Sequence, residues 1–157
     1  APRAATSRLL DVAALPPATV LVHVYDVGDV ELIKKINRVT TANNHVLIGG
    51  VYHAGVEVFG REWGYGFTED DGTGVCWVRP RCNPQHAYKA TAVLGVTKLS
   101  EGEVDELIDR LVEAWPGAAY DLLHRNCCDF ANVLCVELGV GRIPGWIDRL
   151  RRTSAWL

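Results

Sequence analysis

Two adjacent cysteines, Cys127 and Cys128, directly follow Asn126 in the C-terminal quarter of the chain. Asparagine is a preferred N-cap residue because its side-chain oxygen accepts a first-turn amide, so this stretch predicts a helix that begins at the cysteine pair. The positive end of a helix dipole favours a thiolate over a thiol. Cys127 is therefore a candidate nucleophile, although a small core residue also fits such a position.

The second candidate group is His53, in a strand expected at residues 51–59. Side chains alternate along a strand, so His53, Gly55 and Glu57 share one face. Glycines within strands often leave room for a ligand or another backbone. We therefore expect His53 on a sparse, polar face and consider it a candidate general base. His23 lies in a strand that is bulky on both faces, and is expected to be a core histidine.

A histidine beside a cysteine supports one kind of chemistry in particular. An adjacent imidazole and a helix dipole together lower the pKa of a thiol by several units and produce a thiolate–imidazolium pair. Amides of the first helical turn would point towards an oxyanion formed at the attacked carbon. This combination suits acyl transfer from amides, isopeptides or thioesters. For Cys76, Cys82 and Cys135 we expect only the role of small buried hydrophobes.

Alternating and continuous apolar patterns predict the strands that position these groups. The expected strands are 20–27, 51–59, 61–67, 75–78 and 88–96, with a hairpin turn at Gly60. Valines on one face and Leu21, His23 and Tyr25 on the other make 20–27 a central strand. Residues 28–45 are expected to be a polar connection that contains a short helix and a loop.

Capping residues and the spacing of apolar residues predict the helices. Ser100 and Glu103 form a capping box, after which apolar residues recur at helical spacing as far as Trp115. The helix that Asn126 opens is expected to end at Gly139. A short terminal helix is expected from Ile143, with Pro144 at its first position.

Composition restricts the class of protein. The chain has 157 residues, 48% of them hydrophobic, and a net charge of −3, which favours one domain with a core and argues against a nucleic-acid partner. No apolar run has the length of a membrane span. An odd number of cysteines, two of them adjacent, favours a reducing intracellular compartment, and the wide spacing of Cys and His argues against zinc. Methionine is absent, so any targeting segment upstream is not observable.

Several stretches together resemble one known family. They are V-H-V-Y-D-V, G-V-Y-H-A-G-V-E-V-F-G-R-E-W-G-Y-G, G-V-T-K-L-S-E, Y-D-L-L-H-R-N-C-C-D-F and I-P-G-W-I-D-R-L. These resemble the PPPDE family of permuted papain-fold peptidases, also called desumoylating isopeptidases, from about Val20 to Leu150. The runs V-R-P-R-C-N-P and I-P-G-W-I are more similar to the second branch of these isopeptidases than to the first.

The resemblance implies an α+β, circularly permuted papain-like fold: an antiparallel sheet packed against helices, with the nucleophile at a helix N-terminus. Carried over residue by residue, the family nucleophile falls on Cys127 and its general base on His53, a dyad without a third residue, metal or cofactor. Permutation explains why the histidine precedes the cysteine. Cys128 stands where the family usually has asparagine, which leaves open which of the two thiols reacts. The 28–45 connection is also longer than the family's usual linker.

The implied function is a cysteine isopeptidase that removes ubiquitin or a ubiquitin-like modifier such as SUMO from protein lysines. The alternative is a protein S-acyl thioesterase with the same dyad. A lipid acyltransferase of the lecithin:retinol type and a non-catalytic binding module are disfavoured, the first by the I-P-G-W-I motif and the second by the presence of both His53 and Cys127. Modifier conjugates are the expected partners, with a homodimer implied by the family and neither nucleic acid nor an integral membrane segment involved. We expect a flexible arm at 1–18, one catalytic domain at 19–150, a basic tail at 151–157, and a cytoplasmic or nuclear location.

Overall fold

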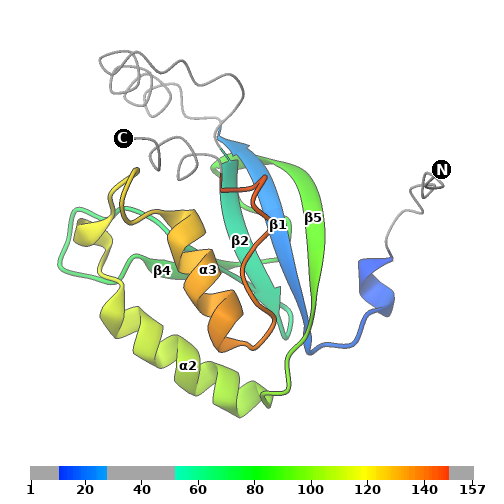
Figure 1. Ribbon diagram of the computed structural model, residues 1–157. Coiled ribbons are helices and arrows are strands. Elements are labelled where there is room, and N and C mark those ends of the chain that lie inside the picture. Colours follow the sequence, from blue (N-terminus) through cyan, green and yellow to red (C-terminus); the bar gives the residue numbers. More distant parts are fainter. Residues whose placement is uncertain (1–10, 28–51, 149–157) are drawn as a thin grey trace.

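The computed structural model describes residues 11–27 and 52–148 (Figure 1). The connection expected at 28–45, its short helix and the tail at 151–157 lie outside the described residues. The division into arm, domain and tail stays a prediction. Pro17 and Ala18, placed in the arm, accept backbone hydrogen bonds from Phe59 and Thr97, each at 2.9 Å.

Five antiparallel strands form one sheet in the order β4-β3-β2-β1-β5. Their bounds are Thr19–Val27 (β1), Tyr52–Val58 (β2), Arg61–Tyr65 (β3), Val75–Val78 (β4) and His86–Val96 (β5). The predicted strands are thus confirmed, except that β5 begins two residues earlier and β3 ends two residues earlier than predicted. The first seven residues of β1 are all buried, which confirms it as a central strand.

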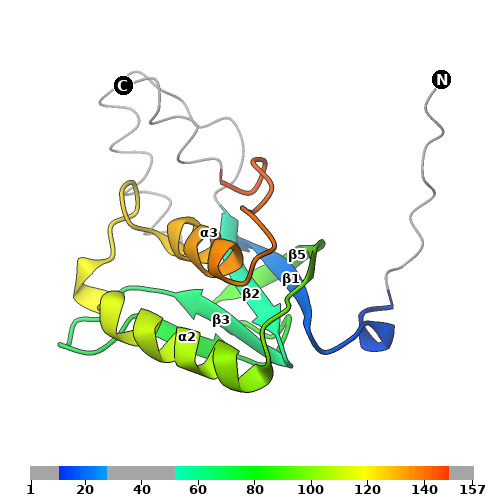
Figure 2. The ribbon, with the colours of Figure 1, turned by 60° about the horizontal axis from the view of Figure 1, so that its bottom comes forward.

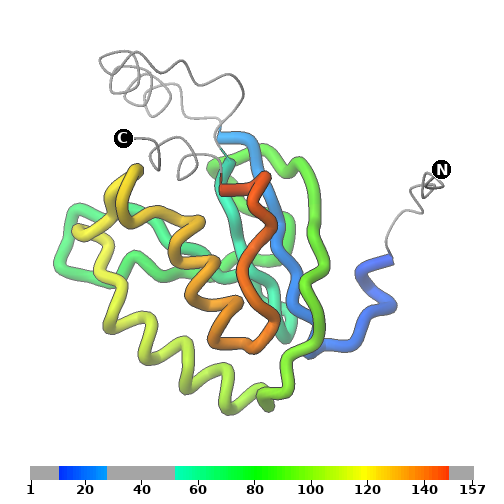
Figure 3. The backbone as a smooth tube through the Cα atoms, viewed as in Figure 1, coloured from blue at the N-terminus to red at the C-terminus, as the bar shows by residue number. Residues whose placement is uncertain are grey.

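The β2–β3 hairpin turns at Phe59 and Gly60, whose φ angles of 48° and 76° are both in the left-handed region. Glycine adopts that region without steric cost, which is why the turn falls at Gly60. Only three residue pairs join the two strands, from Val56–Trp63 to Val58–Arg61. The sheet bends sharply there, so that β3 and β4 run across the direction of β1, β2 and β5 (Figures 1 and 3).

Two helices lie on one side of this sheet (Figure 2). Helix α2 spans Glu101–Ala114, and the predicted capping box of Ser100 and Glu103 is present. Its apolar stripe is buried as predicted, at Val104, Leu107, Ile108 and Leu111. Helix α3 spans Cys127–Glu137 and packs against β2 and β3. None of the helices in residues 11–27 and 52–148 is long and apolar enough to cross a membrane.

Helix α3 is fixed by the core beneath it. Phe130, Ala131 and Leu134 are fully buried. Phe130 meets the ring of Trp115 at 5.5 Å and that of Tyr65 at 6.0 Å, which ties α3 to the end of α2 and to β3. Gly139 has a φ of 81° just beyond the helix, as expected of a glycine stop. This packing therefore fixes the N-terminus of α3 relative to the sheet.

The helix predicted from Ile143 is wrong for the described residues. Residues 145–147 form a single turn, closed by the amide of Ile147 and the carbonyl of Pro144 at 3.0 Å. Gly145 is a poor helix former, and the amide of Ile143 is already bonded to the Asn132 side chain at 3.0 Å. These contacts favour a turn that folds back onto α3.

Candidate active site

The N-terminus of α3 is held by a reciprocal capping box. The Asn126 Oδ1 accepts the amides of Cys128 and Asp129, both at 3.0 Å, and the Asp129 carboxylate accepts the amide of Asn126 at 3.0 Å. The Asn126 Nδ2 donates to the carbonyl of Leu122 at 2.8 Å. The predicted N-cap is confirmed, and Cys127 is the first residue of the helix.

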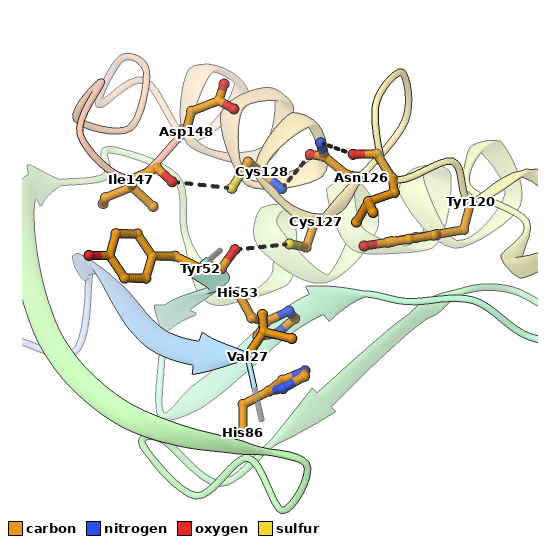
Figure 4. A pocket seen from close by; sticks show the side chains of 11 residues that line it. Val27, Tyr52, His53, His86, Tyr120, Asn126, Cys127, Cys128, Ile147 and Asp148 are labelled. Carbon is orange, nitrogen blue, oxygen red and sulfur yellow. Dashed lines mark hydrogen bonds between the residues drawn. The ribbon is translucent and has the colours of Figure 1, made fainter. Parts of the chain in front are cut away.

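The register of the sheet places His53 beside the N-terminus of α3. Tyr25 on β1 lies opposite His53 on β2, and Val27 lies opposite His86 on β5. The end of β1 and the starts of β2 and β5 therefore meet beside the N-terminus of α3, where the rings of His53 and His86 are 4.8 Å apart. Figure 4 shows His53 directly beneath Cys127.

The two candidate side chains line one small cavity of about 30 Å³. Its lining consists of Val27, Tyr52, His53, His86, Tyr120, Leu122, Asn126, Cys127, Cys128, Ile147 and Asp148. The Cys127 Sγ lies 4.0 Å from the carbonyl oxygen of Tyr52 (Figure 4). Both thiols are almost fully buried, with 6% exposure for Cys127 and 5% for Cys128.

Electrostatics favour a thiolate on Cys127. The pKa of Cys127 lies well below its usual value, mainly because of a hydrogen bond with Cys128. The positive charge of His53 and a hydrogen bond with His53 lower it further, whereas burial opposes this shift. Burial alone would lower the pKa of His53, but the negative charge on Cys127 and their hydrogen bond raise it. The pair is therefore most stable as thiolate and imidazolium.

Cys128 is shifted in the opposite direction. The hydrogen bond to Cys127 and burial raise its pKa well above the usual value, and the charges of Cys127, Asp148 and Asp129 add to this. Its Sγ also lies 3.9 Å from the carbonyl of Ile147. Cys128 thus stays a neutral thiol.

A buried carboxylate lies on the far side of His53. Glu62 is 2% exposed and accepts hydrogen bonds from the Tyr25 hydroxyl at 2.8 Å and the amide of Arg81 at 2.7 Å. Its side chain occupies the space beside Gly55: a Cβ on Gly55 would lie 2.7 Å from Glu62 Cγ. The room expected for a ligand at Gly55 is therefore filled by Glu62.

His23 and the remaining cysteines are outside the cavity. His23 is fully buried and bonded to Thr91 Oγ1 at 2.7 Å and to Glu57 at 2.5 Å, so the prediction of a core histidine is confirmed. Cys135 is buried as predicted, but Cys76 and Cys82 are exposed, because they lie on the edge strand β4 and the loop that follows it. Within residues 11–27 and 52–148, no three His, Cys, Asp or Glu side chains gather as metal ligands would.

Comparison with known proteins identifies the family. Residues 18–156 match the PPPDE putative peptidase domain, which is nearly the whole chain. This chain belongs to the PPPDE family. The α+β fold, with an antiparallel sheet against two helices, is that expected of the PPPDE papain-like fold, and the family supports a peptidase, hence a hydrolase.

Three curated relatives resemble this PPPDE chain. A DeSI-like protein of Arabidopsis thaliana is 32% identical over 92% of the chain and 59% of its own length. The desumoylating isopeptidase 1 homolog of Caenorhabditis elegans is 38% identical over 67% of the chain and 33% of its own length. The DeSI-like protein sdu1 of Schizosaccharomyces pombe is 33% identical over 66% of the chain and 52% of its own length. The PPPDE chain thus spans about a third to three fifths of these relatives.

Sequence reasoning did not assign a role to three residues that the PPPDE fold brings to His53 and Cys127. Glu62 and His86 approach His53 only through the register and curvature of the sheet, so no local pattern marks them. Tyr120 lies seven residues before Cys127 in the quoted motif Y-D-L-L-H-R-N-C, and its aromatic ring in a polar stretch was the signal available.

Proposed function

We propose that this PPPDE protein is a cysteine isopeptidase that releases ubiquitin or a ubiquitin-like modifier such as SUMO from protein lysines. The observation that carries the proposal is the pairing of Cys127 with His53 in one cavity at the N-terminus of α3. Membership of a peptidase family and likeness to a protein named as a desumoylating isopeptidase homolog support the substrate class.

The first half of the reaction forms an acyl-enzyme. The Cys127 thiolate attacks the carbonyl carbon of the isopeptide, and a carbon–sulfur bond forms while the carbonyl oxygen takes the negative charge. As this tetrahedral intermediate collapses, the carbon–nitrogen bond breaks and the His53 imidazolium gives its proton to the departing lysine amine. The modifier is then held as a thioester on Cys127, and His53 is neutral.

The second half restores the enzyme. Neutral His53 takes a proton from a water molecule as the water attacks the thioester carbon. Collapse of this second intermediate expels the Cys127 thiolate and releases the modifier with a free carboxylate. His53 keeps the proton, so the thiolate–imidazolium pair is regenerated and no cofactor is consumed.

The test is hydrolysis of three substrates: ubiquitin and SUMO, each joined to a lysine peptide by an isopeptide bond, and a peptide with a long-chain acyl group on cysteine. We expect release of one of the two modifiers by the native protein, loss of release in Cys127→Ser, and full activity in Cys82→Ser, which changes an exposed cysteine outside the cavity. Cleavage of the acyl-cysteine alone would replace the isopeptidase by the thioesterase alternative. No hydrolysis of any substrate would contradict both.

We also propose, from the family resemblance, that the protein forms a homodimer and works in the cytoplasm or nucleus. Five free thiols, two of them exposed, fit a reducing compartment. Sedimentation equilibrium of the purified protein would show the dimer as twice the chain mass, and a single chain mass across the accessible concentrations would exclude it. Subcellular fractionation of the native source tests the location.

A further inference from the structure

Attack by Cys127 creates an oxyanion, and its stabilisation requires hydrogen-bond donors at the start of α3. Two of the first-turn amides, those of Cys128 and Asp129, are already bonded to the Asn126 side chain. The amide of Phe130 is bonded to the carbonyl of Asn126 at 3.1 Å. The capping box therefore leaves only the amide of Cys127 from this turn, which is one donor where acyl-transfer sites commonly use two.

The Tyr120 side chain places a hydroxyl group near Cys127. It lines the cavity with His53 and Cys127, and Figure 4 shows its hydroxyl directed at Cys127. The side chain and the backbone of Cys127 both lie close enough to the Tyr120 hydroxyl to shift its pKa. The hydroxyl of Tyr120 and the amide of Cys127 thus converge on one place beside the reacting sulfur.

The surroundings hold the Tyr120 ring in this orientation. Tyr120 ends the short 3₁₀ turn Gly117–Ala119, and the amide of Gly117 is bonded to the carbonyl of Gly72 at 3.0 Å. The ring packs 5.2 Å from that of Tyr65, which is itself fixed by a hydrogen bond from its hydroxyl to the carbonyl of Pro116 at 2.9 Å. The hydroxyl is therefore preorganised before any substrate binds.

The side chains of Asn126, Cys128 and Asp148, which also line the cavity, are less suited to this task. The Asn126 side chain uses its oxygen for two amides and its nitrogen for the carbonyl of Leu122. The Cys128 thiol is engaged with Cys127, and an ionised Asp148 carries no proton to donate. Burial and then the charge of Cys127 raise the pKa of Tyr120, so its hydroxyl keeps its proton at neutral pH.

We propose that Tyr120 is a catalytic residue whose hydroxyl, together with the amide of Cys127, forms the oxyanion hole for acyl transfer. This assignment rests on the proposed role of Cys127 as the nucleophile.

Two reactions of the same sulfur separate this role from a structural one. Acylation of Cys127 by p-nitrophenyl acetate passes through an oxyanion and releases p-nitrophenolate, whereas alkylation by iodoacetamide displaces iodide at a tetrahedral carbon and forms none. In Tyr120→Phe we expect acylation to fall about 100-fold, the usual loss for one oxyanion donor. Alkylation, measured on the plateau of its pH profile, should stay within about threefold.

Tyr88→Phe is the control, because it removes a tyrosine hydroxyl that is bonded to Thr91 at 2.6 Å, outside the residues that line the cavity. Both of its rates should match those of the native protein. Equal losses of acylation and alkylation in Tyr120→Phe, unchanged rates in both, or no acylation of native Cys127 would each overturn the assignment. A native protein that is acylated through Tyr120 but cleaves no isopeptide would refute the isopeptidase proposal and leave the oxyanion hole standing.

Discussion

Two neighbouring thiols in the first turn of α3 are equally buried but differ in pKa and in the groups that they contact. Cys127 meets His53 and has a lowered pKa, while Cys128 turns towards the carbonyl of Ile147 and has a raised one. The thiolate is the reactive form of cysteine, so the difference selects Cys127. This contrast supports our proposal that Cys127, and not Cys128, is the nucleophile.

The first prediction concerns the pH dependence of Cys127. The reactive ion pair exists above the lowered pKa of Cys127 and below the raised pKa of His53, so native alkylation should persist at pH 6. His53→Ala removes the charge and hydrogen bond that favour the thiolate, so the pKa of Cys127 rises. We expect alkylation by iodoacetamide at pH 6 to slow by about tenfold, since the smaller thiolate fraction is partly offset by greater nucleophilicity. His124→Ala, at an exposed histidine paired with Asp121, should leave the rate unchanged, and an unchanged rate in His53→Ala would contradict the pairing.

The second prediction tests whether Cys128 acts on Cys127 as a hydrogen-bond donor. Cys128→Ala removes the hydrogen bond that contributes most to the low pKa of Cys127, so the alkylation profile should move to higher pH. Cys128→Ser keeps a hydroxyl donor and should leave the profile nearly in place. Equal shifts in the two variants, measured from the pH dependence of alkylation by mass spectrometry, would show that Cys128 does not act through this hydrogen bond.

At the scale of elements, the site depends on a cap and a hairpin. Both were predictable because their rules are local: an asparagine before a helix, and alternation broken by Gly60. The local rules could not predict which elements, distant in the sequence, pack against each other. Glu62 was read as one residue of a strand, and only the register and bend of β2 and β3 bring it to Gly55 and towards His53.

The third prediction concerns the cap of α3. Asn126→Ala removes the partner of two amides and of one carbonyl at a buried position, so we expect unfolding in urea to show a loss of about 2 kcal/mol or more. Ser100→Ala removes the exposed cap of α2 and should cost about 1 kcal/mol. Similar costs for the two would indicate that burial of the Asn126 side chain adds nothing to its capping.

The fourth prediction concerns Gly55, within β2, and Gly66, which directly follows β3. A Cβ at Gly55 would collide with the buried Glu62 side chain, which is held by Tyr25 and Arg81 and cannot move away freely. Gly55→Ala should therefore lower the free energy of unfolding by about 1–3 kcal/mol. Gly66→Ala meets no atom within 4 Å and should change it by less than about 0.5 kcal/mol. A tolerated Gly55→Ala would mean that Glu62 is not fixed in this position.

At the scale of the whole molecule, the fold assembles one site from distant parts of the chain. The end of β1, the start of β2, the start of β5, the N-terminus of α3 and the turn at 145–147 meet around a single cavity (Figure 4). Apolar alternation and caps predicted nearly every element, and the family motifs predicted the pairing of His53 with Cys127. The proposed role of Tyr120 was missed because it depends on the path of the chain between α2 and α3, and the motif that contains Tyr120 does not show where this path places its hydroxyl.

The measurement that tests the central claim most directly is the intact mass of the protein after exposure to ubiquitin and SUMO with electrophilic C-termini. The account predicts a single adduct from one of these probes, mapped to Cys127, absent in Cys127→Ser, retained in Cys128→Ser and slowed in His53→Ala. An adduct on Cys128, or labelling that persists in Cys127→Ser, would contradict it.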